Sequence, residues 1–150
     1  MSENNDLIKL YSGQILALAA DIPHTDRLQN PHASVKRRSP LCGSTITVDL
    51  NMANDCVSEF GQDVKACALG QAAASVVGGA VVGRNEDEIR RAQTQLKAML
   101  KSDGPAPDAP FDELKVLLPA KEFKNRHASI MLALDATVEA IEQARNANCA

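Results

Sequence analysis

The sequence lacks tryptophan and has only one tyrosine and three phenylalanines among its 150 residues. Aromatic packing therefore contributes little, and aliphatic side chains and alanine must supply most of the buried surface. A hydrophobic content of 45% with 23% charged residues is nevertheless typical of a globular protein. At this length we expect a single domain over residues 1–150.

An excess of basic residues is also missing. The formal net charge is −3, whereas a nucleic-acid-binding protein needs a clustered basic surface to neutralise phosphates. The compact basic run Lys36-Arg37-Arg38 is either a solvated strand end or a contact for an acidic partner. The composition predicts no nucleic acid among the partners.

Long apolar runs and a targeting signal are absent too. No stretch approaches the roughly 18 apolar residues of a membrane span, and residues 1–9 are polar and acidic, unlike a signal peptide. This predicts a cytoplasmic protein without a membrane contact. In that reducing compartment, cysteines at 42, 56, 67 and 149 favour metal binding, sulfur chemistry or simple burial over disulfides.

The usual catalytic signatures are not found. The chain has no Ser/His/Asp order, no phosphate-binding glycine loop with its lysine and no HExxH pattern. We therefore expect a protein that is not an enzyme.

Hydrophobic periodicity predicts an α+β fold. An amphipathic helix is expected over about residues 4–20, and residues 45–52 alternate apolar and polar side chains as a half-buried strand does. Asn54-Asp55 predicts a turn into a second strand over about 57–66, in which Gly61 indicates a bulge or an edge. Residues 34–38 are expected to add an outer strand.

The rest of the chain predicts helices that cover the apolar face of this sheet. A short Ala-rich helix over 68–77 is expected to stop at Gly78-Gly79, and Asn85 is expected to cap a helix that runs to Lys101. After a proline-rich loop over 104–110 and a short segment over 111–117, a last helix is expected over about 123–145. The predicted architecture is a three-stranded antiparallel sheet, covered on one face by helices, with an N-terminal helix.

Cys42 and Cys67 are the strongest chemical signal in the chain. Cys67 opens a predicted helix close to Lys65, and both the field of a helix N-terminus and a cation favour the thiolate, a nucleophile and metal ligand. Cys42 precedes Gly43, which lets the backbone approach a bound ion closely. Since there is no CxxC pair, spacing alone leaves open that both are ordinary half-buried cysteines.

Four motifs in order resemble those of the U-type iron–sulfur cluster assembly scaffolds, the IscU, SufU and NifU N-terminal family. They are Asn30-Pro31, Pro40-Leu41-Cys42-Gly43-Ser44, Cys67 followed by Ala72-Ala73-Ala74-Ser75, and Arg126-His127-Ala128-Ser129-Ile130-Met131-Leu132-Ala133. The resemblance covers nearly the whole chain and is closest in spacing to SufU. It implies a SufE/NifU-like fold and a scaffold that receives sulfur from a cysteine desulfurase and serves recipient apo-proteins.

In that family three cysteines and an aspartate form the metal or cluster site. Cys42 and Cys67 match the first two cysteines, but Ser44 stands at the aspartate position and Ser129 at the third cysteine position. Neutral hydroxyls are poor ligands for zinc or iron beside thiolates. The resemblance thus implies a transient iron–sulfur cluster or zinc, or no metal in the isolated chain.

Auxiliary residues and other functions stay open. Lys65, Arg126 and His127 are candidates for an auxiliary role, although His127 would point away from Ser129 on a regular helix. Leu118-Pro119-Ala120-Lys121 is a displaced, partial match to the chaperone-recognition signature of IscU. Besides a scaffold, the residues are compatible with a persulfide acceptor for a cysteine desulfurase and with a metal-free regulatory module of the assembly machinery.

Overall fold

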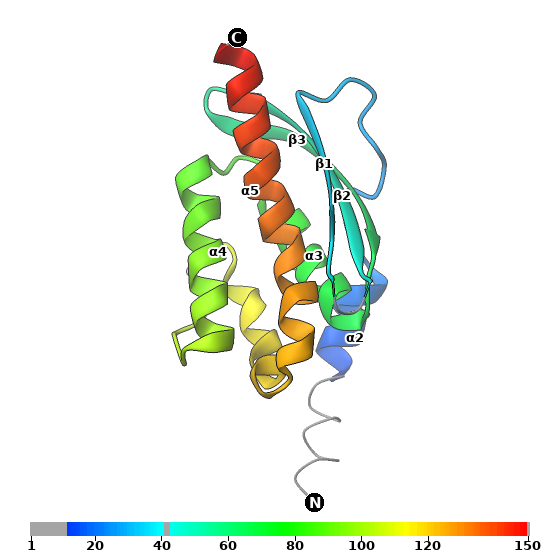
Figure 1. Cartoon of the computed structure of the whole chain (residues 1–150), viewed down its shortest axis with the longest axis vertical. Helices are drawn as coiled ribbons and strands as arrows, with labels where there is room; N and C mark the ends of the chain where they lie inside the picture. Colours follow the sequence, from blue (N-terminus) through cyan, green and yellow to red (C-terminus); the bar gives the residue numbers. More distant parts are fainter. Residues whose placement is uncertain (1–11, 41–42, 150) are drawn as a thin grey trace, which may run out of the picture.

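The computed structural model describes residues 12–40 and 43–149, with side chains as far as Ala147. In chain order its elements are α2 (Gly13–Ala20), β1 (Ala33–Arg38), β2 (Thr45–Ala53), β3 (Cys56–Lys65), α3 (Ala68–Ala80), α4 (Glu86–Lys101), the 3-10 helices η1 (Asp112–Glu122) and η2 (Lys124–Arg126), and α5 (His127–Cys149). Within these residues the strands form one antiparallel sheet in the order β1-β2-β3. Helix α5 crosses the sheet against β1 and β2, and α4 packs on the outside of α5 (Figure 1). The predicted α+β class is confirmed.

The β2–β3 hairpin forms where the sequence predicts it. Asn54 and Asp55 have φ values of 54° and 65°, the left-handed conformation that a two-residue hairpin turn requires. The ladder is irregular between Asn51 and Met52, so the bulge predicted at Gly61 lies elsewhere. The alternative role predicted for Gly61, a place on an edge strand, is correct.

Gly61 is needed because a loop lies directly over it. A Cβ atom at this position would come 2.5 Å from the carbonyl oxygen of Asp26. The backbone N–H of the next residue, Gln62, donates to the carbonyl of His24 at 2.8 Å. The loop between α2 and β1 is thereby held against β3.

Helix α3 continues through both glycines that the sequence predicts as its stop. The reason is contact with the sheet, since a Cβ atom at Gly78 would lie 2.5 Å from Nε2 of Gln62. That amide donates to the carbonyl oxygens of Pro23 and Ala74 at 3.1 Å each. Glycine here permits close packing of the helix, and the prediction of a helix end was wrong.

The ends of the other helices agree with the sequence in part. Helix α4 begins with a capping box in which Asn85 and Glu88 exchange side-chain and backbone hydrogen bonds, as its sequence predicts. The last helix begins later than expected, at His127, because the preceding residues form 3-10 turns. The predicted N-terminal helix is present as α2 from Gly13, and its expected first residues lie outside the described part of the chain.

The core lies between the sheet and the helices, and it is mainly aliphatic. Leu50, Val77 and Leu134 are fully buried, as are the alanines at 72–74 of α3, whose small side chains let neighbouring elements approach. Phe60 and Phe111 supply the aromatic part. Among the described residues, no helix combines the length and the apolar character that crossing a membrane requires.

Candidate sulfur site

Three side chains from distant parts of the sequence meet at one end of the sheet. Sγ of Cys67 lies 3.5 Å from Oγ of Ser129, and that hydroxyl donates to Oγ of Ser44 at 3.1 Å. These are three of the four positions at which the sequence predicts ligands, two of them in degenerate form. The fold therefore brings Cys67, Ser129 and Ser44, hereafter the sulfur site, into contact.

Each residue of the sulfur site is held by the start of an element. Cys67 is the N-cap of α3, with φ −67° and ψ 169° and no side-chain capping bond. Ser129 lies in the first turn of α5, and Ser44 directly precedes β2. Cys67 thus stands where the backbone N–H groups of a helix N-terminus favour negative charge on the sulfur.

Burial separates the sulfur from the hydroxyls. Ser129 is 1% and Ser44 5% exposed, whereas Cys67 is half-buried. The two hydroxyls therefore form the inner wall of the site, and the sulfur is the atom that a partner or ion can reach.

Gly70 is a component of this site that sequence reasoning missed. A Cβ atom on Gly70 would lie 2.5 Å from Oγ of Ser129 and 2.9 Å from the Cβ of Ala66. No other residue type leaves room for the Ser129 hydroxyl so close to α3. An isolated glycine one turn into a predicted helix was the available signal, because such a glycine often marks close packing.

The hydrogen bonds of the sulfur site can run in two directions. A hydroxyl has one hydrogen and two acceptor lone pairs. When Ser129 donates to Ser44, the thiol of Cys67 donates to Ser129. When Cys67 is a thiolate, the Ser129 hydrogen can turn to the sulfur and Ser44 can donate to Ser129. The pair of hydroxyls can therefore follow a change of charge at Cys67 without moving heavy atoms.

The remaining predicted site residues are less directly placed. Cys42 lies outside the described residues. The neighbouring Gly43 has φ +71° and donates its N–H to the carbonyl of Ser39 at 3.1 Å. The backbone N–H of Ser39 in turn donates to the carbonyl of Ser44 at 2.8 Å. These two bonds fix the backbone on which Ser44 stands.

Of the candidate auxiliary residues, His127 has hydrogen-bond partners other than the sulfur site. His127 is only 2% exposed, and its Nε2 lies 3.0 Å from the carbonyl oxygen of Ala120 and 3.1 Å from that of Lys121. Both neighbours are acceptors, so Nε2 carries a hydrogen and is not free as a metal ligand. Lys65 ends β3 as an exposed residue and Arg126 ends η2 half-buried.

The donor set of the sulfur site is poor for a closed metal centre. Across residues 12–40 and 43–149, no group of three or more His, Cys, Asp or Glu side chains could hold a metal ion. The described part of the site offers one thiol and two neutral hydroxyls, and zinc or iron beside sulfur favours thiolate, imidazole or carboxylate.

A second polar cluster, the Asp49 cluster, is buried on the outer face of the sheet beneath the α2–β1 loop. The Asp49 side chain is fully buried and accepts hydrogen bonds from Nε and Nη2 of Arg27 at 2.5 and 3.1 Å. It also accepts from the Leu28 N–H at 3.1 Å and the Ser34 hydroxyl at 2.7 Å. Burial by itself would raise the pKa of Asp49, but these hydrogen bonds together outweigh it, and the pKa is lowered.

Comparison with known proteins gives a clear structural answer. No family model matches the chain, and no curated protein matches it. Among solved structures, the N-terminal part of a nitrogen-fixing NifU-like protein from Brucella abortus is 40% identical, with a TM-score of 0.92 over 94% of this chain and 98% of that one. An iron–sulfur cluster assembly scaffold described for the SUF system of Fervidobacterium islandicum AW-1 is 16% identical, with a TM-score of 0.80 over 89% of this chain and 98% of that one.

The helix-covered sheet thus has the NifU-like fold, as the sequence predicts. At 40% identity over almost the full length of both chains, the chain belongs to the family of NifU-like N-terminal proteins. The predicted family is confirmed.

Proposed function

We propose that this protein acts in iron–sulfur cluster assembly as a scaffold-type protein that holds its cargo transiently through Cys67 and Cys42. The observation that carries the proposal is the contact of Cys67, Ser129 and Ser44. Family membership supplies the class of function, and the half-buried thiol at a helix N-terminus supplies a sulfur able to bind iron or zinc.

The substituted hydroxyls determine how tightly cargo is held. Two thiolates leave a tetrahedral ion with two positions to fill, and serine hydroxyls are weak candidates for them. We therefore propose that iron, a nascent cluster or zinc is bound only while a second protein contributes ligands. The partners that fit are a cysteine desulfurase as sulfur source and the apo-proteins that receive the product.

Anaerobic reconstitution tests this proposal. The protein is incubated with iron, sulfide and a cysteine desulfurase, and thiolate-to-iron absorption is followed in the visible range. Absorption is expected for the native chain and for Cys56→Ser, because Cys56 is also a free, half-buried cysteine but belongs to the β2–β3 hairpin. It is expected to disappear in Cys67→Ser. A native sample that stays colourless and free of iron contradicts the scaffold function.

A second candidate function, persulfide transfer, is favoured by the hydroxyl pair behind Cys67. In this step the Cys67 thiolate attacks the terminal sulfur of a desulfurase persulfide. The S–S bond of the donor breaks, the donor cysteine leaves as a thiolate, and Cys67 carries the persulfide without net oxidation or reduction. Ser129 can donate a hydrogen bond to the sulfur while it is anionic.

Persulfide labelling separates the two candidate functions. Mass spectrometry after incubation with a desulfurase and its cysteine substrate is expected to find one added sulfur on Cys67 if the chain relays sulfur. A chain that binds iron but never carries persulfide acts as a scaffold only. Normal cluster assembly with the Cys42→Ser, Cys67→Ser double variant would instead favour the metal-free regulatory module.

A further inference from the structure

A cavity of about 640 Å³ opens between the second half of α4 and the first turns of α5, and its lining does not include Cys67, Ser129 or Ser44. The two helices run antiparallel, so the end of α4 and the start of α5 lie together at the lower end of the molecule (Figure 1). The lining residues are Gln93, Thr94, Lys97, Lys101, Lys124, His127, Ala128, Met131 and Asp135. We refer to it as the lysine cavity.

The charge around the lysine cavity is unbalanced. Its one carboxylate, Asp135, accepts a hydrogen bond from Gln93 at 2.8 Å, and no described acidic side chain forms an ion pair with Lys97, Lys101 or Lys124. Three positive charges thus face one negative charge in a protein whose net charge is −3.

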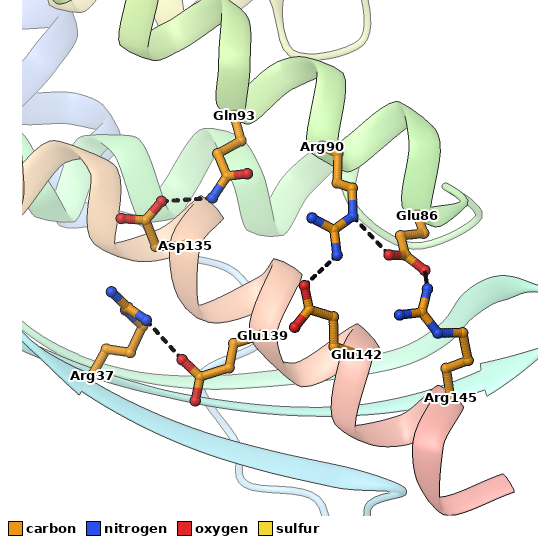
Figure 2. Close-up of polar contacts among 8 residues, drawn as sticks. All are labelled: Arg37, Glu86, Arg90, Gln93, Asp135, Glu139, Glu142 and Arg145. Atoms are coloured by element: carbon orange, nitrogen blue, oxygen red, sulfur yellow. Dashed lines mark hydrogen bonds and ion pairs between the residues drawn. The ribbon is translucent and has the colours of Figure 1, made fainter. Parts of the chain in front are cut away.

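Charges are balanced at the other end of the same helix pair, between the start of α4 and the C-terminal half of α5. There Arg90 bonds to both Glu86 and Glu142, and Arg145 also bonds to Glu86 (Figure 2). Arg37 of β1 reaches Glu139 at 2.7 Å in the same view. Every arginine drawn there has an acidic partner, whereas the three lysines that line the lysine cavity have none among the described residues.

The start of α5 adds to the positive potential, and Lys101 in the last turn of α4 offsets the negative end of the α4 dipole. Helix α4 has Glu86, Asp87 and Glu88 in its first turn, which offset the positive end of its dipole. The first turn of α5 contains no acidic residue, and it begins at the wall of the lysine cavity with Lys124 just before it. An anion at this point would interact favourably with both the helix and the lysine.

A buried polar atom at this wall has no partner. Nε2 of His127 is satisfied by two carbonyl oxygens, but Nδ1 is buried without a hydrogen bond among the described residues. Leaving a buried ring nitrogen unpaired is costly. Because Nε2 carries the hydrogen, Nδ1 is an acceptor, and a hydroxyl group of a bound molecule can donate to it.

We propose that the lysine cavity binds a small molecule that has two or more phosphate or carboxylate groups. Lys97 and Lys101 are one helical turn apart and can each meet one anionic group, while Lys124 and His127 approach from the start of α5. The volume exceeds what a single inorganic anion fills and suits a small organic ligand. The apolar wall of Ala128 and Met131 accommodates the carbon skeleton.

Calorimetric titration at low salt tests this assignment, with pyrophosphate and citrate as separate probes. The native protein is expected to bind at least one of them, and the Lys97→Gln, Lys101→Gln double variant is expected to bind it at least tenfold more weakly. The matched control is the Lys36→Gln, Lys115→Gln double variant, which removes the same charge from two exposed lysines outside the cavity. This control is expected to retain native affinity within twofold.

The outcomes separate the sources of the anionic groups. Binding of pyrophosphate alone assigns phosphate, binding of citrate alone assigns carboxylate, and both outcomes support the cavity. If neither probe binds at millimolar concentration, the proposal is overturned. It is also overturned if the two double variants weaken binding equally. All the exchanged lysines are exposed, so the variants are expected to melt within a few degrees of the native protein, which circular dichroism checks.

Discussion

Two buried polar clusters on the same sheet are built on different electrostatics. The Asp49 cluster contains a full negative charge that receives four hydrogen bonds, one pair of them from an arginine. The sulfur site contains two neutral hydroxyls joined to one thiol. The two hydroxyls of the sulfur site are nearly as buried as Asp49, but only the Asp49 cluster has the donors and the cation that a buried charge requires.

The difference explains how the sulfur site can be stable without a bound metal ion. A carboxylate at position 44 and thiolates at 67 and 129 would repel one another unless a cation lay among them. Serine at 44 and 129 removes that requirement, since hydroxyls satisfy one another without metal. The Asp49 cluster depends on its negative charge, whereas the sulfur site is stable because its serine hydroxyls are neutral.

The largest expected effect comes from breaking the Asp49 cluster. Asp49→Asn replaces one acceptor oxygen with an NH2 group that faces the donors of Arg27 or Leu28, so we expect a loss of about 3 kcal/mol in the free energy of unfolding. Urea denaturation measures it. Asp55→Asn, which changes an exposed carboxylate in the β2–β3 turn, is the control and is expected to change stability by less than about 0.5 kcal/mol. Equal losses in both variants would contradict a specific contribution of the Asp49 cluster to stability.

Restoring the family ligands should turn the sulfur site into a metal-dependent one. In Ser44→Asp with Ser129→Cys, we expect metal-free protein to lose about 2 kcal/mol because a carboxylate and a second thiol are buried without a cation. Zinc should restore this stability, since an ion that binds only the folded state stabilises it. Urea denaturation with and without zinc measures both the loss of stability and its recovery. If zinc does not change the stability of the variant, Cys67 and the new Cys at position 129 cannot coordinate the same ion.

The two clusters should also differ in how their contribution to stability depends on pH. The pKa of Asp49 is below its ordinary value of 3.8 in the folded state, so its contribution is complete above that value and is lost as the pH falls through the folded pKa. We expect the native protein to lose up to about 1.4 kcal/mol per pH unit from this group below pH 4. Denaturation at a series of pH values should show that Asp49→Asn removes this component. The Ser129→Ala variant should retain it.

The sequence predicted the elements whose signals are local. Asn54-Asp55 at the hairpin and Asn85 at the start of α4 have geometry that their own side chains dictate, and both were located correctly. The motifs around Cys67 and Ser129 predicted that these two residues meet, because the family resemblance placed them together, and the two side chains are in contact. That Ser129 bonds both Cys67 and Ser44 required the three-dimensional arrangement.

What could not be predicted depends on contacts between distant segments. Gly78 looked like a helix stop, but its absent side chain makes room for Gln62, which lies on another element. Asp49 looked like an ordinary polar residue on the solvent side of a strand. Its burial arises because the loop that contains Arg27 folds back over the sheet. The hydrophobic periodicity of one segment does not show which distant segment will pack against it.

Two glycines of α3 provide a matched test of packing behind the sulfur. Gly70→Ala must displace the Ser129 hydroxyl or α5 and is expected to cost about 1 kcal/mol, even though alanine favours a helix. A Cβ at Gly79 meets nothing within 4 Å, so Gly79→Ala is expected to stabilise by roughly 0.5–1 kcal/mol. Thermal denaturation compares the two. A stabilising Gly70→Ala would mean that α3 and α5 have room to separate.

The smallest expected effect isolates the hydroxyl next to the sulfur. Ser129→Ala should lower the free energy of unfolding by only about 0.5–1 kcal/mol, because no charge is exposed or stranded. Its clearer consequence should be chemical, since the Cys67 thiolate loses a hydrogen-bond donor. Alkylation of Cys67 by iodoacetamide, followed by mass spectrometry of its peptide, is expected to slow about threefold.

Thr137→Val is the control for that experiment. Its hydroxyl also lies buried on α5, where it donates to the carbonyl of Ala133 at 2.7 Å without touching the sulfur site. The control should lose comparable stability and leave the alkylation rate unchanged. If both variants slow alkylation equally, the rate reports general loosening of α5. If only Ser129→Ala does, the hydroxyl acts on the sulfur directly, and Ser129 has a chemical role in addition to its place in the fold.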